Sequence, residues 1–135
     1  MKITTRGRYA VSLMLDLAIN YDNGSFLSLK DISEKEGISL KYLEKIMLDL
    51  KKKDFFLTSR GQDGGYKLKY SPKEYKLGDI INAVEKEMAP ASCVKDDNFC
   101  SKMGICKTYP IWKDLNDEIN KYLNSKTLED YMEVK

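Results

Sequence analysis

The residues of this chain best suited to metal chemistry are three cysteines that lie close together in the sequence. Cys93, Cys100 and Cys106 are the only cysteines among the 135 residues, and they fall within one short, mostly polar stretch. Structural cysteines are usually scattered through apolar core segments, whereas thiolates gathered on one loop are soft ligands for a metal ion or an iron–sulfur cluster. The spacing indicates such a site, with three-cysteine zinc and a metal-free group of thiols as open alternatives.

Length and composition limit the class of protein. A chain of 135 residues builds one domain, with room for a helical extension. It has no early apolar run of signal-peptide type and no stretch of about 18 apolar residues, so we expect a cytoplasmic protein with reduced thiols and no membrane partner. The sequence has no histidine, nucleophile elbow or P-loop, and we therefore expect no enzyme activity.

The formal net charge of +2 conceals an asymmetry along the chain. Residues 1–76 carry 15 basic and 10 acidic side chains, a net charge of +5, whereas residues 77–135 carry −3. A basic part is suited to contact with a polyanion, because lysine and arginine at phosphates release counterions. A solvated lysine-rich face is the alternative interpretation of the charge taken alone.

The first 53 residues have the pattern of three helices. Apolar residues recur at helical spacing from Thr5 to Tyr21, which predicts a helix packed on a core. Ser28 and Ser39 stand where helix N-caps are expected; they predict a short helix that Gly37 ends and a second helix from Leu40 to about Lys53. Two short helices separated by a glycine-containing turn are typical of a helix-turn-helix.

A β-hairpin follows these helices. Residues 55–59 and 66–70 alternate as strands do, and the glycine-rich segment 60–65 between them suits a tight turn. A helix-turn-helix followed by a hairpin predicts a winged helix, with its second helix in the major groove of DNA and the hairpin tip at the backbone or minor groove. The candidate DNA-contacting residues are Ser39, Lys41, Tyr42, Glu44, Lys45, Lys52, Arg60 and Gly61.

Glu44 is the unusual member of this set because a carboxylate that faces DNA repels phosphate. Two interpretations remain open for it. It accepts a hydrogen bond from a cytosine amine and penalises sites without one, or it pairs with Lys41 or Lys45 on the same helix.

The second half of the chain is predicted to be helical on both sides of the cysteines. Residues 77–88 form one amphipathic pattern, and a longer one runs from Pro110 to about Asn124 with Trp112 in its apolar stripe. We interpret the long stripe as a dimer surface, with a core-packing helix as the alternative. We therefore divide the chain into a winged helix-turn-helix DNA-binding domain, 1–76, and a helical cluster-binding and dimerisation region, 77–135.

Four sequence segments together resemble one known family. They are Thr4–Val11, Asp31–Glu44, Arg60–Tyr66 and the three spaced cysteines ahead of Trp112. The combination is similar to the IscR/NsrR-like regulators, iron–sulfur cluster-sensing winged-helix transcription factors of the Rrf family. The similarity extends from the first helix to the long helix, and the combination is specific although no single segment is.

The resemblance implies a mainly α winged-helix homodimer that binds a pseudo-palindromic, double-stranded operator. It implies major-groove reading or screening by Lys41, Tyr42, Glu44 and Lys45, minor-groove contact by Arg60 and Gly61, and an iron–sulfur cluster held by Cys93, Cys100 and Cys106. We expect a [2Fe–2S] cluster ahead of a [4Fe–4S] cluster. In IscR-type members the glutamate matching Glu44 helps to distinguish operator classes between cluster-loaded and empty protein, so the resemblance implies a similar filter here.

The chain departs from the family pattern at its ligands. The first cysteine gap is one residue longer, Tyr109 occupies the position of the histidine ligand, and Arg8 stands where some relatives donate an acidic ligand. The fourth ligand is therefore open among oxygen ligands, an external thiol and water. The oxygen candidates are Asp96, Asp97 and Glu85.

These observations predict a dimeric transcriptional regulator, of repressor type, whose operator binding responds to a cluster that senses iron–sulfur status, redox state or nitric oxide. Two alternatives stay open. One is a winged-helix regulator that senses thiol oxidation or a metabolite without a cluster. The other is an iron–sulfur carrier or electron-transfer protein built on the same scaffold.

Overall fold

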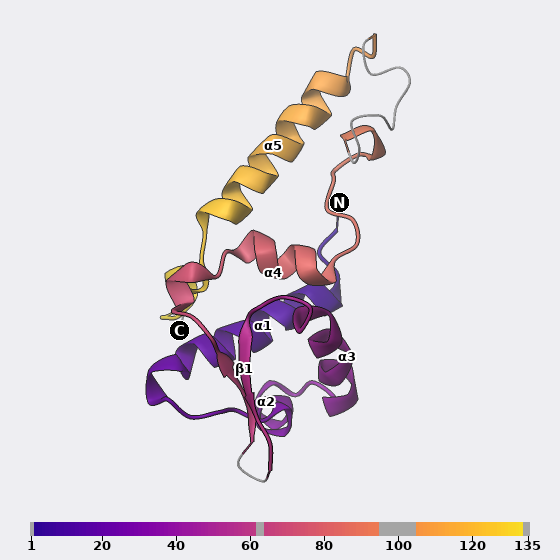
Figure 1. Cartoon of the computed structure of the whole chain (residues 1–135). Helices are drawn as coiled ribbons and strands as arrows, with labels where there is room; N and C mark the ends of the chain where they lie inside the picture. The colour runs from indigo at the N-terminus through magenta and orange to yellow at the C-terminus, as the bar shows by residue number, and fades with distance from the viewer. Residues whose placement is uncertain (1, 62–63, 95–104, 134–135) are drawn as a thin grey trace.

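Helices and one β-hairpin make up the described part of the chain (Figure 1). The computed structural model describes residues 2–61, 64–94 and 105–133. In chain order its main elements are α1 (Thr5–Ile19), α2 (Leu29–Glu36), α3 (Leu40–Leu50), β1 (Phe56–Ser59), β2 (Gly65–Leu68), α4 (Leu77–Val84) and α5 (Tyr109–Ser125). Short 3-10 turns lie between or after them: η1 (Tyr21–Asn23), η2 (Pro72–Glu74), η3 (Ser92–Val94) and η4 (Leu128–Tyr131). The predicted mainly α fold with a small hairpin is confirmed.

The hydrophobic core is built around α1. Leu13, Met14 and Leu17 on this helix are essentially inaccessible to solvent, as the helical spacing predicted. They pack with side chains from three other elements, namely Leu43, Ile46, Met47 and Leu50 of α3, Ile80 and Val84 of α4, and Leu128 of η4. The core therefore joins residues on both sides of residue 76.

The helix-turn-helix forms through the predicted caps. The Ser28 hydroxyl accepts the amide of Asp31 at 3.0 Å and begins α2, and Gly37, with φ of +69°, ends it. The Ser39 hydroxyl accepts the amide of Tyr42 at 3.0 Å and begins α3. Helix α3 ends at Leu50, earlier than the expected Lys53, because the amides of Lys52 and Lys53 bond to carbonyls three residues back in a tighter turn.

The hairpin pairs with the chain segment ahead of α2. Phe56 pairs with Leu68 and Ser59 with Gly65 in the antiparallel register. Leu27, ahead of α2, exchanges backbone hydrogen bonds with Tyr66 at 2.9 and 2.8 Å and adds a one-residue third strand. A side chain at Gly65 would collide with the Leu27 carbonyl, so only glycine permits this approach.

Helix α5 stands away from the core (Figure 1). It packs against α4 and η3, and none of its residues is buried within the described chain. Its C-terminal end is tied back by the amide of Leu77, which donates to the Lys126 carbonyl at 2.9 Å. The core-packing alternative for this helix was therefore wrong. No helix in the described residues has the length and apolar character needed to cross a bilayer.

Candidate nucleic-acid interface and cysteine segment

The predicted DNA-contacting side chains of α3 lie on its exposed N-terminal part. Lys41, Glu44 and Lys45 all face solvent, on the side of the helix opposite the buried residues. The Ser39 hydroxyl uses its lone pair to cap the helix, which leaves its O–H able to donate elsewhere. The first turn of α3 thus presents two lysines, a carboxylate and a hydroxyl to a partner.

Tyr42 has a structural contact as well as an exposed edge. Its ring meets the ring of Tyr9 on α1 edge-on, with centroids 5.6 Å apart and planes at 76°. Edge-to-face aromatic pairs are favourable beyond the area they bury. Tyr42 therefore helps to seat α3 on α1 while its remaining surface stays accessible.

Glu44 forms no ion pair with Lys41 or Lys45 in the residues that the structure describes. Its carboxylate is exposed to solvent at the first turns of α3. Of the two interpretations made from the sequence, the pairing with a neighbouring lysine is not seen.

Asp49 organises the other end of α3. Its carboxylate pairs with the Arg6 guanidinium of α1 and lies 3.5 Å from the ammonium of Lys52. Arg6 also donates to the backbone carbonyl of Lys45 at 3.5 Å. Sequence reasoning missed Arg6, which lies within the Thr4–Val11 segment that carried the family resemblance.

The tip of the hairpin presents Arg60 and Gly61 to solvent. Gly61 has φ of +101°, a conformation that favours glycine. In Figure 1 the hairpin reaches out at one end of the molecule and α5 projects at the opposite end. The hairpin and α5 therefore lie at opposite ends of the described part of the molecule.

The cysteines frame the segment that leads into α5. Cys93 lies on η3 and is partly buried, and Cys106 lies just ahead of α5 with its Sγ 3.3 Å from the Thr108 hydroxyl oxygen. Cys100 lies outside the described residues. Because η3 packs against α5, both described thiols belong to the region around this helix. Within the described residues, no three potential ligands form a metal-binding group.

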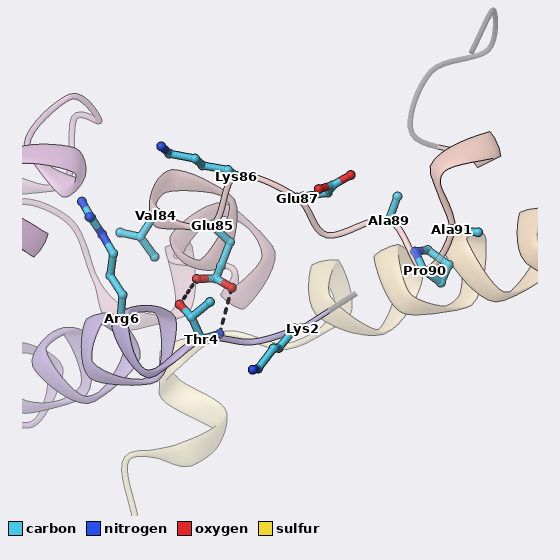
Figure 2. Close-up of a pocket in the computed structure, with 10 residues that line it drawn as sticks. All are labelled: Lys2, Thr4, Arg6, Val84, Glu85, Lys86, Glu87, Ala89, Pro90 and Ala91. Atoms are coloured by element: carbon cyan, nitrogen blue, oxygen red, sulfur yellow. Dashed lines mark hydrogen bonds between the residues drawn. The ribbon is translucent and has the colours of Figure 1, made fainter. Parts of the chain in front are cut away.

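Glu85, a candidate fourth ligand, is engaged elsewhere. Both of its carboxylate oxygens accept hydrogen bonds from Thr4, one from the backbone amide at 3.0 Å and one from the hydroxyl (Figure 2). Asp96 and Asp97, the other two oxygen candidates, lie outside the described residues. Tyr109, at the position of the family's histidine, is the first residue of α5.

Comparisons with known proteins agree with this architecture. The model of the Rrf2 family, an iron-dependent transcriptional regulator, matches residues 3–134. Protein rrf2 of Nitratidesulfovibrio vulgaris is 36% identical over 132 residues, which cover 98% of this chain and 87% of the relative. The transcriptional regulator IscR of Pectobacterium carotovorum is 38% identical over 135 residues, 100% of this chain and 81% of the relative.

Among solved structures, CymR, the global cysteine regulator of B. subtilis, superposes with a TM-score of 0.82 at 30% identity. The match covers 100% of this chain and 98% of CymR. The family model and the name of IscR both describe regulators of transcription, a non-enzymatic class that acts by binding DNA. This chain is therefore a member of the Rrf2 family and a winged-helix, DNA-binding transcriptional regulator.

Proposed function

We propose that this regulator binds a two-fold symmetric operator as a homodimer, and that the chemical state of Cys93, Cys100 and Cys106 sets its affinity for that operator. The observation that carries the proposal is the position of the described thiols. Cys106 lies three residues ahead of Tyr109, the first residue of α5, and η3 with Cys93 packs against α5. A ligand or an oxidant at these thiols would therefore act on the helix that presents the exposed apolar stripe.

The operator is read by the winged helix-turn-helix, residues 1–76. Side chains at the start of α3 enter the major groove, Ser39 and Lys52 contact phosphates, and the wing tip contacts the minor groove. Glu44 screens base pairs, since its exposed carboxylate repels the phosphate backbone and is favourable only where it accepts a hydrogen bond from a cytosine amine. The proposed contacts are Ser39, Lys41, Tyr42, Glu44, Lys45, Lys52, Arg60 and Gly61.

The dimer forms through α5, within the region 77–135. Ile111, Trp112, Leu115 and Tyr122 on this helix are between 36% and 55% exposed. Beside it, Ile3 and other apolar side chains line a groove of about 340 Å³. A continuous apolar surface of this kind is stabilised when a partner covers it. A second copy of the chain supplies the same stripe, as a two-fold interface requires.

The three thiols fit an iron–sulfur cluster through the chemistry of their donor atoms. As thiolates they are soft ligands, and the two described ones are only partly exposed. Cys93, Cys100 and Cys106 would hold the cluster, of [2Fe–2S] type, and when bound it would supply an iron centre that responds to redox state and nitric oxide. Glu85 is engaged with Thr4, so we assign the fourth ligand to a group other than Glu85.

A cluster-free regulator is the second candidate function. It is supported by the similarity to CymR, the global cysteine regulator of B. subtilis, and by the absence of histidine from the chain. In this version the cysteines respond directly by oxidation, since a thiolate that is partly exposed reacts with oxidants.

One anaerobic preparation separates these functions. Iron, sulfide and visible absorption are measured on the purified protein, beside a titration with an operator recovered by selection from random DNA duplexes. Iron and sulfide together with charge-transfer absorption support the cluster. A colourless protein whose operator affinity changes on thiol oxidation supports the cluster-free version. A colourless protein with operator affinity indifferent to its thiols contradicts both.

A further inference from the structure

Glu85 holds the beginning of α1 through two hydrogen bonds from Thr4, and we call this contact the clasp. Its carboxylate accepts the Thr4 amide at 3.0 Å and the Thr4 hydroxyl, and that hydroxyl oxygen accepts the amide of Gly7 at 3.2 Å (Figure 2). Thr4 is the N-cap of α1, so the carboxylate is bonded to the cap itself. A carboxylate at this position also meets the positive end of the helix dipole. The contact joins residues that are 81 positions apart in the sequence.

Gly7 provides the room for this clasp. A Cβ atom added at Gly7 would lie 3.0 Å from both Cδ and Oε1 of Glu85. The carboxyl group therefore lies directly against the backbone of the first turn of α1. A side chain at this position requires the Glu85 carboxyl group to shift by a few tenths of an ångström.

The first turn of α1 also contacts α3. Arg6, which stands between Thr4 and Gly7 in the first turn, pairs with Asp49 of α3 and donates to the Lys45 carbonyl at 3.5 Å. Lys45 is one of the proposed DNA contacts. A shift of the first turn of α1 would therefore move the side chain that holds α3 at two points.

After α4, Glu85 begins the segment that leads to the cysteines, residues 85–92, which we call the connector. It follows α4 with an extended backbone, φ of −91° and ψ of 133°, and the chain continues from it to Cys93 on η3. The connector and the first turn of α1 line an open pocket of about 520 Å³, with Thr4, Arg6 and Glu85 among its lining residues (Figure 2). Glu85 thus lies where the connector meets α1.

We propose that Glu85 is a positioning residue for operator binding. It couples the position of the connector to the position of α3 through Thr4 and Arg6. This inference rests on the proposed regulation by the cysteines. Glu85 touches no DNA in this account; it acts by fixing the start of α1.

The first test is the operator affinity of the full-length Glu85→Ala protein as a function of salt. We expect the affinity to fall about five- to twentyfold, within the range of typical couplings between sites. The slope of log affinity against log salt stays unchanged, because no phosphate contact is removed. Glu74→Ala, which removes an exposed carboxylate on η2, is the matched control and leaves affinity unchanged.

Variants of the partner residues separate the clasp from a general loss of folding. Thr4→Val should lower operator affinity as Glu85→Ala does. Thr4→Ser should retain wild-type affinity because it keeps the hydroxyl. The double variant Thr4→Val with Glu85→Ala should bind no more weakly than either single variant. Gly7→Ala lowers affinity without lowering Tm, because alanine is favoured over glycine within a helix while its methyl group displaces Glu85. Wild-type affinity in both Glu85→Ala and Gly7→Ala overturns the inference.

The response to the thiols distinguishes this inference from the proposed function. Operator affinity is measured for wild type and Glu85→Ala, each with and without Cys106→Ser. A response to Cys106→Ser in wild type that is lost in Glu85→Ala supports the clasp. An equal response in both backgrounds overturns the clasp and leaves the proposed function standing. No response in either overturns the proposed function and the coupling with it.

Discussion

Arg6 of α1 and Asp49 of α3 form an ion pair that joins α3 to α1, the central helix of the core. Asp49 is partly buried, and its carboxylate also pairs with the ammonium group of Lys52 at 3.5 Å. One carboxylate therefore neutralises two cations beside the proposed DNA surface. Its effect on DNA binding has two opposing parts, since it repels phosphate but holds α3 in place.

We predict that the positioning effect is the larger one. Asp49→Ala should lower the free energy of unfolding by about 1 kcal/mol, the usual contribution of a partly buried hydrogen bond. It should also weaken operator binding, although a negative charge is removed. Urea unfolding and an operator titration measure the two effects, with the exposed Asp22→Ala as control. Tighter operator binding at unchanged stability would show that Asp49 acts only as a charge.

Asp16 is a buried carboxyl between α1 and α2. Burial, together with the neighbouring Glu36 carboxyl, raises the pKa of Asp16 from 3.8 to about 6, although Lys35 at 3.1 Å acts in the opposite direction. The folded protein therefore binds this proton more tightly than the unfolded chain does. Its stabilising contribution is fully present below about pH 4 and is lost as pH rises through about 6.

Asp16→Asn should remove this pH dependence. Relative to wild type, the variant should gain stability by on the order of 2 kcal/mol between pH 4 and pH 7, because asparagine carries no charge to bury. Urea unfolding at both pH values provides the measurement. Wild-type and variant stabilities that change in parallel with pH would show that Asp16 titrates normally.

Arg60→Ala tests the wing. Loss of one cation at the DNA should lower affinity about tenfold and reduce the salt slope by about 1, as expected when one arginine contact is removed. Lys73→Ala removes an exposed cation on η2, away from the hairpin tip, and should change neither quantity. If both variants lower affinity and slope alike, the wing has no special role and only the overall charge matters.

Leu115→Glu tests the dimer surface on α5. A charge in the apolar stripe should dissociate the dimer, and affinity for the full operator should fall to that for a half-site. Sedimentation equilibrium follows the association. Asn120→Glu places the same charge on the same helix among its exposed polar residues, and it should remain dimeric. A monomeric wild type, or a dimeric Leu115→Glu protein, would contradict the assignment of α5.

The elements that could be predicted from the sequence are those specified by local signals. Ser28, Gly37 and Ser39 bounded the helix-turn-helix correctly because a cap needs only its own neighbours in the chain. The period of two placed the hairpin, and the apolar stripe placed α5. The predicted helix 77–88 extends four residues beyond the observed end of α4 at Val84. The prediction was too long because Met88 continues the apolar pattern after the helix has ended.

What could not be predicted depends on contacts between distant residues. The bridge between Leu27 and Tyr66 involves a single residue, which has no periodicity of its own. Glu85 appeared in the sequence as one of several oxygen ligands, and only the fold reveals that Thr4 engages it. The DNA contacts and cluster ligands named from the sequence stay predictions, and Cys100 lies outside the described residues.

The most direct test of the regulatory account is operator affinity measured anaerobically on one protein preparation in two states, as purified and after exposure to nitric oxide or an oxidant. The account predicts at least a tenfold difference in Kd between the two states of wild type, and little or no difference for Cys106→Ser, whose sulfur is replaced without changing the size of the residue. A Kd that is the same in both states of wild type, in protein shown to retain its thiols before exposure, would contradict it.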